Sequence, residues 1–392
     1  MQRAGWPNVK RLVKLFEGNA PNAPGRLRLL VFTEHRNATF FINFVHPFSR
    51  KIADRQWDLV HFSADDFAGS DPAAIVTQVG KTLTQQRPAA AIFSRYVAPA
   101  APELMQLCRS VDIPVYFHID DLLFNLPPSI GDAYQRTYDD AYRNALALCL
   151  DGSDAILCST QRLAGAIRKR YPAHRIEVLV GVAYLPEIAG GIHLIRWLRR
   201  LKRAMKHRGT MVLGYMGSAS HLPDLEDIVP AIAGILQSDP RVRFETFGLR
   251  MPLRLQQFGP KRVGAIGYTR SYREFLGVLF ELGWDLGLAP IADNTFNRCK
   301  TATKFVEYTG CAIPVLAANR PPFSALDWPT APLLLADDRE WGELIRQLLD
   351  DRGLRNHLLT NAQALCESRF SLAVAAAALE RAIAPRGAPR EH

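Results

Sequence analysis

Short hydrophobic runs recur along the chain, and segments with the helical spacing of hydrophobic and polar positions separate them. A first set of runs spans positions 27–32, 58–62, 89–93, 113–119, 155–158 and 176–182, and a second set spans positions 211–216, 242–247, 263–266, 285–289, 313–317 and 332–335. Buried strands that alternate with helices are typical of parallel sheets with helices on both faces. The pattern therefore predicts an α/β protein with two doubly wound domains and ligands at the carboxyl ends of the strands.

Composition supports a globular protein of this size. The chain has 392 residues, 48% hydrophobic and 22% charged, which suits two ordinary domains. No hydrophobic run approaches the ~18 residues of a membrane span, and the first residues lack the hydrophobic core of a secretory signal. The six cysteines form no CxxC pair, which argues against zinc and against a disulfide framework. We therefore expect a protein of the reducing cytoplasm.

The second predicted domain begins with a strand, a loop of small residues and a helix, in the segment LGYMGSASHLPDLEDIVPAI. Gly217, Ser218 and His221 lie in this loop. A glycine-containing loop between a strand and a helix start offers free backbone N–H groups to a phosphate. The alternative interpretation is an ordinary strand-to-helix turn.

The segment NRCKTATKFVEYTGCAIPVL places Lys300, Lys304 and Glu307 at positions i, i+4 and i+7, hence on one face of a predicted helix that ends near positions 309–310. Lys300 would lie near the helix start, where the helix dipole disfavours a cation unless an anion binds there. The alternative is a surface pair of Lys304 and Glu307 with Lys300 solvated. If this loop and the Gly217 loop meet, their lysines and amides suit a diphosphate and the glutamate suits sugar hydroxyls.

Together with the segment DLGLAPIADNTFNRCKTATKFVEYTGCAIPVLAAN, these residues resemble the C-terminal half of GT-B glycosyltransferases, in the family-4-like group of bacterial surface-polysaccharide enzymes. The resemblance is specific over residues 211–320. In that group two glutamates eight residues apart flank the nucleotide-sugar. Glu307 matches the second, which typically holds the ribose, whereas Cys299 stands at the first position. Asn297 and Lys300 stand beside it, as in a branch in which Asn-x-x-Lys precedes Lys-x-x-Glu.

The resemblance implies a GT-B fold, in which two Rossmann-like domains face a cleft and a C-terminal helix crosses back to the first domain. The expected parts are a basic extension over 1–25, an acceptor domain over 26–184, a basic amphipathic linker helix over 185–209, a donor domain over 210–365, and the crossing helix with a tail over 366–392. We also expect Tyr268 or Thr269, which follow a strand of the donor domain, near the nucleotide base.

The first domain carries VYFHIDDLLFNLPP, in which a strand ends at His118 and Asp120 and Asp121 follow. Similar enzymes have a comparable aspartate pair facing the interdomain cleft, so these three residues are our candidates for catalysis. The alternatives are two capping aspartates with a buried histidine, or a pair of metal ligands as in the other large glycosyltransferase fold, which has one domain.

The end of the first strand of this domain carries the polar residues His35, Arg36 and Asn37. Their position at the carboxyl end of a strand makes them candidates for acceptor binding. Plain loop polarity is the alternative for each of them.

The net charge of +10 is concentrated, because no acidic residue lies between Ile188 and Pro223. The cations of this stretch are Arg196, Arg199, Arg200, Lys202, Arg203, Lys206 and Arg208. The hydrophobic residues of the same stretch that follow helical spacing are Leu194, Leu198, Leu201 and Met205, beside Trp197. A smaller stripe of Val9, Leu12, Val13 and Phe16 lies near the N-terminus. A basic amphipathic helix with tryptophan suits an anionic membrane surface, and we expect contacts by Trp197, Arg199, Arg200 and Arg203. A solvated interdomain helix and a nucleic-acid patch are the alternatives, and no nucleic-acid motif accompanies the patch.

These features predict a glycosyltransferase at the inner face of the cell membrane. It would move a sugar from a UDP-, GDP- or dTDP-linked donor to a lipid-linked glycan acceptor of lipopolysaccharide or a related surface polysaccharide. Lysines and amides would stabilise the leaving diphosphate, so we expect no metal and no cofactor. The resemblance implies retention at the anomeric carbon, and an inverting route with Asp120 or Asp121 as base stays open. The rivals are a sugar-nucleotide epimerase of the same fold and a non-catalytic glycan-binding or nucleotide-sugar-binding protein.

Overall fold

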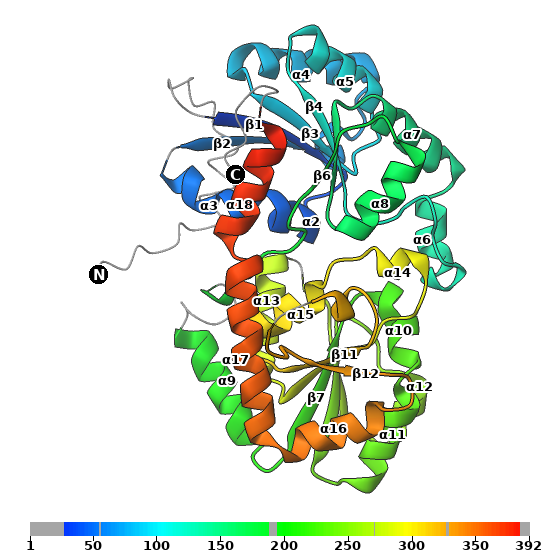
Figure 1. Ribbon diagram of the computed structural model, residues 1–392, viewed down its shortest axis with the longest axis vertical. Coiled ribbons are helices and arrows are strands. Elements are labelled where there is room, and N and C mark those ends of the chain that lie inside the picture. The colour runs from blue at the N-terminus through cyan, green and yellow to red at the C-terminus, as the bar shows by residue number, and fades with distance from the viewer. Residues whose placement is uncertain (1–26, 55, 188–193, 270, 327–328, 385–392) are drawn as a thin grey trace. The chain divides into compact units, whose positions relative to one another are not determined.

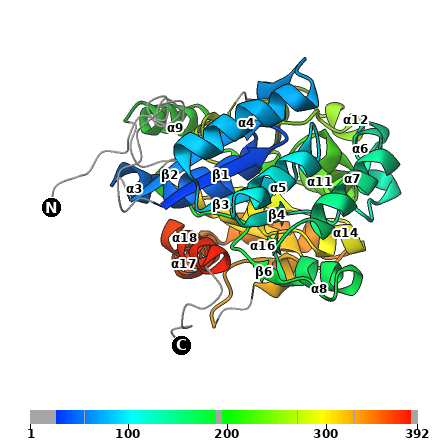
Figure 2. The same ribbon diagram turned by 90° about the horizontal axis from the view of Figure 1, so that it is seen from above.

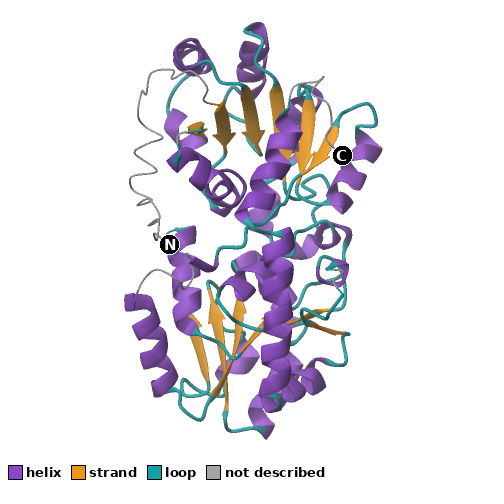
Figure 3. Ribbon diagram, turned by 60° about the vertical axis from the view of Figure 1, so that its left-hand side comes forward, coloured by secondary structure: helices purple, strands orange, loops and turns teal. Residues whose placement is uncertain are grey.

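The computed structural model describes residues 27–54, 56–187, 194–269, 271–326 and 329–384. These residues form two compact units: the first comprises residues 27–120, 138–181 and 375–384, and the second comprises residues 121–137 and 182–374. Each unit holds one parallel six-stranded sheet with helices on both of its faces (Figure 3). All twelve predicted strands are found. The predicted basic extension over 1–25 lies outside the described residues.

The sheet of the first unit has the strand order β2-β1-β3-β4-β5-β6. Its strands are β1 (Leu27–Thr33), β2 (Trp57–Ser63), β3 (Ala90–Ser94), β4 (Val115–Ile119), β5 (Ala155–Cys158) and β6 (Ile176–Val178). Its helices are α2 (Ala38–Phe40), a π-helical turn (Phe41–Val45), α3 (His46–Ala53), a 3₁₀ turn (Ala64–Phe67), α4 (Pro72–Gln86), α5 (Ala101–Ser110), α7 (Asp140–Asp151), α8 (Gln161–Arg170) and most of α18 (Leu372–Ile383).

The C-terminal helix α18 completes the core of the first unit. Leu379 and Ile383 of α18 belong to the same hydrophobic cluster as Leu29 and Val31 of β1, and α4 and α5 cover the opposite face of the sheet (Figure 2). The helix begins within the second unit and ends within the first. The C-terminal helix therefore crosses back, as predicted.

The sheet of the second unit has the strand order β12-β11-β10-β7-β8-β9. Its strands are β7 (Met211–Met216), β8 (Val242–Phe247), β9 (Val263–Ile266), β10 (Leu286–Ala289), β11 (Val315–Ala318) and β12 (Leu334–Ala336). Its helices are a 3₁₀ turn (Pro128–Ile130), α6 (Asp132–Thr137), α9 (Leu194–Lys206), a 3₁₀ turn (Ala219–His221), α10 (Leu222–Glu226), α11 (Val229–Ser238), α12 (Leu253–Gln256), α13 (Tyr272–Leu282), α14 (Thr295–Arg298), α15 (Thr303–Gly310), a 3₁₀ turn (Phe323–Ala325), α16 (Trp341–Asp350) and α17 (Arg352–Arg369). No helix among the described residues is long and hydrophobic enough to cross a membrane.

Three strands, β4, β11 and β12, start two residues later than the hydrophobic pattern predicts, and β6 ends at Val178 rather than at position 182. The runs 113–119 and 313–317 both contain a proline, and β4 and β11 begin directly after Pro114 and Pro314. Proline has no backbone N–H and therefore terminates the ladder on that side.

The sheet of the second unit requires a glycine at position 214 of β7. A Cβ atom on Gly214 would lie 1.8 Å from Cδ2 of Trp284, a fully buried side chain that donates a hydrogen bond from Nε1 to Glu245 (2.8 Å). We expect Gly214→Ala to displace this ring and lower the free energy of unfolding by about 1–3 kcal/mol. Gly234→Ala is the matched control, because a Cβ atom there meets nothing within 4 Å. Equal urea midpoints for the two variants would contradict this packing argument.

Candidate functional site

The strands β7, β8 and β9 are neighbours in the sheet of the second unit, and the backbone segments that follow their carboxyl ends pack closely against one another. Gly217 follows β7 and its N–H donates to Phe247 O at the end of β8 (3.0 Å), while the N–H of Gly248 donates to Ile266 O at the end of β9 (3.0 Å). A Cβ atom on Gly248 would lie 2.6 Å from the carbonyl oxygen of Gly217, and its φ is +83°. Only glycine fits that position. The sequence reasoning missed Gly248, although its place directly after a strand was a usable signal.

The loop after β7 is tied to the loop before α14 by a buried carboxylate. Asp224 Oδ2 lies 3.0 Å from Nδ1 of His221, and Asp224 Oδ1 accepts hydrogen bonds from the Ala292 N–H (2.9 Å) and from Asn297 Nδ2 (3.4 Å). Asn297 is buried and its Nδ2 also donates to the Ala292 carbonyl (2.9 Å). The His221 ring packs against Gly217. The structure therefore brings together the two loops that the sequence analysis assigned to one ligand.

Two lysines stand beside this histidine. Desolvation lowers the pKa of Lys304, in the first turn of α15, to about 8, and its Nζ lies 5.4 Å from the ring centroid of Tyr215. The charge of Lys304, burial and the charge of Lys300 together lower the pKa of His221 to about 3, so this ring is neutral. Among the described residues neither lysine forms an ion pair. The edge of the sheet thus carries two cations with no carboxylate bound to them.

The expected position of Lys300 on the helix face is wrong. Helix α14 ends at Arg298 and α15 begins only at Thr303, so Lys300 lies in the turn between them. Its N–H closes that turn on Asn297 O (3.1 Å), and its Nζ lies 4.8 Å from the ring centroid of Phe296. The break removes the conflict with the helix dipole, because Lys300 points from a loop rather than from a helix start. The predicted end of the helix at Gly310 is confirmed.

Glu307 occupies the next turn of α15 on the Lys304 face. Its Oε1 accepts a hydrogen bond from the hydroxyl of Tyr272 (2.8 Å), the first residue of α13. Desolvation raises the pKa of Glu307 to about 7, although Tyr272 and the charge of Lys304 oppose the shift. No Lys304–Glu307 ion pair exists, so the alternative of a simple surface pair has no support here. Nothing in the sequence pointed to Tyr272.

The raised pKa of Glu307 predicts a stability cost that rises with pH. The pKa of about 7 in the folded protein lies above the ordinary value of 4.5, so folding favours the protonated carboxyl and the penalty grows as pH rises between these values. Glu307→Gln should therefore raise the unfolding midpoint by a few degrees at about pH 8 and leave it unchanged near pH 4. The exposed Glu226→Gln is the control. Identical melting curves of Glu307→Gln and the unmutated protein at about pH 8 would contradict the assignment.

The remaining donor candidates of this unit lie at the surface. Ser218 is exposed and its hydroxyl lies 2.8 Å from that of Ser220. Tyr268 follows β9 with 82% of its surface exposed. Their roles in ligand binding stay predictions.

The first unit has an ionic cluster at the carboxyl end of β4. Asp120 accepts hydrogen bonds from Thr39 Oγ1 (2.8 Å) and from Arg95 Nη1 (3.2 Å), and its side chain is 18% exposed. Burial raises the pKa of Asp120, but Arg95, His118 and Thr39 outweigh burial and bring it below the ordinary value. Asp120 is therefore ionised at neutral pH. Arg95 has φ +56°, a strained conformation that a non-glycine residue adopts only where its surroundings impose it.

His118 lies inside the sheet rather than at its surface. The residue is fully buried, its Nδ1 lies 2.9 Å from Ser94 Oγ, and its ring packs edge-on against Phe44. Burial lowers its pKa to about 4. This environment matches the alternative of a buried histidine. A direct role in the chemistry stays a prediction.

The remaining candidate residues of the amino-terminal half are the three predicted acceptor-binding residues and Asp121, and each of them contacts other residues of the protein. His35 Nδ1 lies 3.4 Å from Asp65, and Arg36 pairs with Asp66 (3.1 Å). Asn37 caps α2 by accepting a hydrogen bond from the Phe40 N–H (3.3 Å). Asp121 is half-buried, and its backbone carbonyl accepts from the Leu123 N–H (2.9 Å). None of these contacts tests the proposed acceptor roles.

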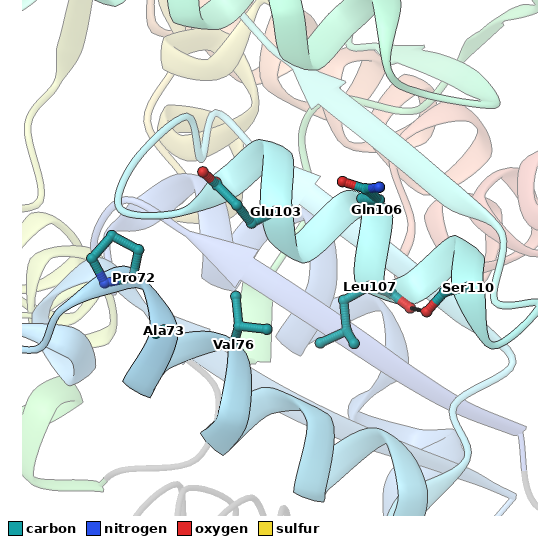
Figure 4. A pocket seen from close by; sticks show the side chains of 7 residues that line it. All are labelled: Pro72, Ala73, Val76, Glu103, Gln106, Leu107 and Ser110. Atoms are coloured by element: carbon teal, nitrogen blue, oxygen red, sulfur yellow. Dashed lines mark hydrogen bonds between the residues drawn. The ribbon is translucent and has the colours of Figure 1, made fainter.

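A surface groove of about 510 Å³ lies between α4 and α5 of the first unit (Figure 4). Its lining residues are Pro72, Ala73, Val76, Glu103, Gln106, Leu107 and Ser110. None of the predicted site residues lines it. Within the described ranges no cluster of three His, Cys, Asp or Glu side chains could hold a metal ion, and all six cysteines are buried and free.

Comparison with known proteins identifies the fold. No family model matches the chain, and no curated protein matches it. Several solved structures match most of it, among them the following three. HepE of Anabaena, in complex with UDP and glucose, has a TM-score of 0.64 and 14% identity, covering 91% of this chain and 99% of that one.

The two other structures give the same fold. Sucrose-phosphate synthase of Thermosynechococcus elongatus has a TM-score of 0.64 and 12% identity over 91% of this chain and 99% of that one. A UDP-N-acetylglucosamine 2-epimerase, described as putative, from Listeria monocytogenes has a TM-score of 0.55 and 12% identity over 91% and 96%. Two parallel six-stranded sheets with alternating helices match these structures, so the chain has the two-domain Rossmann-like GT-B fold.

Proposed function

We propose that the protein is a glycosyltransferase that uses a nucleoside-diphosphate sugar as donor and holds it at the second unit. The observation that carries this proposal is a pair of lysines that form no ion pair with any described residue and lie near His221 of the Gly217 loop. Lys300 lies in the turn before α15, and Lys304 lies in the first turn of that helix. A half-buried cation that no carboxylate contacts directly is costly, and a diphosphate would relieve that cost. HepE, which has this fold, was solved in complex with UDP and glucose.

The neighbouring side chains suit the other parts of such a donor. Glu307, oriented by Tyr272, would accept hydrogen bonds from the two ribose hydroxyls. His221 is neutral and its Nδ1 faces Asp224, so Nε2 is left as an acceptor. An acceptor nitrogen suits a sugar hydroxyl better than a phosphate oxygen. Lys300, Lys304 and backbone amides would stabilise the leaving diphosphate without a metal ion.

The first unit would bind the acceptor and would contribute Asp120 to the reaction. Asp120 is ionised and paired with Arg95, so its carboxylate is a weak base and is poorly suited to abstract a proton. Its negative charge is better suited to stabilise positive charge that develops on the sugar, or to accept a hydrogen bond from the acceptor hydroxyl. Retention at the anomeric carbon fits this role. We further propose a lipid-linked surface glycan as acceptor and the inner membrane face as the place of action, supported by the exposed hydrophobic residues of α9.

The test is a turnover assay of the full chain with UDP-glucose and other UDP-, GDP- and dTDP-sugars, with a lipid-linked glycan extract as acceptor. We expect sugar transfer with release of the nucleoside diphosphate, and undiminished transfer in EDTA. Complete loss of transfer in EDTA with recovery in magnesium or manganese would contradict the role assigned to the lysines.

A sugar-nucleotide epimerase is the second candidate, because an epimerase shares the fold at a TM-score of 0.55. The same assay separates the two. An epimerase converts the nucleotide-sugar to its epimer without any acceptor, whereas a transferase requires the acceptor for turnover. A protein that binds the donor and turns over neither way would be the non-catalytic alternative.

A further inference from the structure

Helix α9 lies at the outside of the second unit (Figure 1). Its contacts with that unit are made by its arginines instead of by its hydrophobic residues. Arg196 Nη1 lies 2.8 Å from Glu281 Oε1 of α13, and Arg203 Nε donates to the Leu282 carbonyl (3.0 Å). Arg203 also contacts the buried carboxylate of Glu245. No residue of α9 is fully buried. The usual orientation of an amphipathic helix on its own protein is thus reversed.

Two glycines leave space for these arginines. A Cβ atom on Gly277 would lie 2.0 Å from Cζ of Arg196, and one on Gly283 would lie 3.1 Å from Nε of Arg200. Arg200 donates to the Cys311 carbonyl (2.8 Å) and its guanidinium stacks on a phenylalanine ring of α13 at 4.5 Å. These fitted contacts fix the rotation of the helix about its axis. Arg200 and Arg203, which the sequence analysis assigned to the membrane, are occupied by the protein itself.

The hydrophobic face of α9 is consequently turned to solvent. Its side chains are 42–70% exposed. They are Leu194, Ile195, Trp197, Leu198, Leu201 and Met205, here named the α9 stripe. Exposed apolar patches of this kind on soluble proteins mark interaction sites.

Charge identifies what would cover the α9 stripe. Lys202, Lys206 and Arg208 are exposed beside it, and the helix carries no acidic residue. A second copy of this surface would bring cations against cations, and the N-terminal segment of the chain, with Lys10, Arg11 and Lys14, is also basic. An anionic surface is the complementary occupant.

We propose that the α9 stripe inserts into the interfacial region of an anionic lipid bilayer, with Lys202, Lys206 and Arg208 at the lipid headgroups and the inward arginines holding the helix in place. A helix of 13 residues is about 20 Å long, which suits a helix lying in the plane of the interface. The inference extends the proposed function, since it specifies how the enzyme would reach a lipid-linked acceptor.

The test is co-sedimentation of the full chain with vesicles of phosphatidylglycerol and phosphatidylcholine, at low salt, against vesicles of phosphatidylcholine alone. We expect binding to the mixed vesicles and at least about 10-fold weaker binding to the neutral ones. The variant carrying Trp197→Ser, Leu198→Ser and Leu201→Ser should bind at least about 30-fold more weakly. Leu253→Ser, at an exposed leucine elsewhere in the second unit, is the matched control and should bind like the unmutated chain.

Calorimetric titration with UDP separates this inference from the proposed function. Unchanged UDP affinity in the triple serine variant, together with lost vesicle binding, supports both. No vesicle binding by the unmutated chain, or vesicle binding unaffected by the three serines, overturns the lipid proposal while leaving the donor site intact. Self-association that the three serines abolish, without vesicle binding, would instead assign the stripe to a second copy. Vesicle binding without UDP affinity would overturn only the donor site.

Discussion

Replacing Lys304 by methionine should weaken UDP binding by about 10- to 150-fold, the loss of one charge-assisted hydrogen bond of about 1.5–3 kcal/mol. Methionine has an unbranched side chain of similar length and removes the charge, which lies 5.4 Å from the ring centroid of Tyr215. Because the pKa of Lys304 is lowered to about 8, the affinity of the unmutated protein should also fall as pH rises through that value. Calorimetric titration at about pH 7 and about pH 9 measures both effects.

The control is Lys261→Met, which removes an exposed lysine from the same unit and should leave UDP affinity unchanged. Equal weakening in both variants would mean that UDP responds only to the net charge of the protein. An affinity of Lys304→Met equal to that of the unmutated protein would remove this lysine from the donor site.

Replacing Asp120 by asparagine should reduce the turnover number by at least about 100-fold while UDP affinity stays within a factor of about two. The substitution keeps the size of the side chain but removes the negative charge that Arg95 and Thr39 hold in place. The loss should be constant from about pH 6 to pH 9, because the pKa of Asp120 lies below its ordinary value and the group does not titrate in that range. Turnover and calorimetry on the same preparation are the measurements.

Asp58→Asn is the matched control for Asp120→Asn. Asp58 pairs with Arg28 at 2.8 Å near the amino ends of β1 and β2, whereas Asp120 follows the carboxyl end of β4. We expect Asp58→Asn to lower stability and to leave the turnover of folded protein unchanged. A similar fall in turnover and in unfolding midpoint for both variants would assign Asp120 to structure only.

The fold was predictable because each strand and each helix has its own hydrophobic pattern, and these patterns follow one another along the chain. Parallel strands buried on both faces read as uniformly hydrophobic runs, and all twelve runs became strands. Their ends were less predictable: β4 and β11 start only after Pro114 and Pro314, and β6 ends four residues before its hydrophobic run does. The strand–loop–helix pattern also predicts Gly217, Lys304 and Glu307 at the same edge of one sheet.

Features that depend on three-dimensional packing could not be read from the sequence. Periodicity could not reveal the break at Lys300, because four residues of irregular backbone between α14 and α15 leave the helical spacing of the flanking residues intact. Tyr272 contacts Glu307 across 35 positions of the chain, a separation at which no local rule applies. The orientation of α9 was also hidden, since its arginine face and its hydrophobic face have equally regular spacing. Only the packing of Arg196 and Arg200 against Gly277 and Gly283 reveals which face contacts the protein.

The central claim is that Lys304 and Glu307 bind one nucleoside diphosphate, the lysine at the diphosphate and the glutamate at the ribose. One set of calorimetric titrations tests it directly, with UDP and inorganic pyrophosphate as ligands and the unmutated chain, Lys304→Met and Glu307→Gln as proteins. We predict that Lys304→Met weakens both ligands, whereas Glu307→Gln weakens UDP about 10-fold or more and changes pyrophosphate by less than about twofold. Affinities of both variants equal to those of the unmutated chain for UDP would contradict the claim, and the donor site would then lie elsewhere.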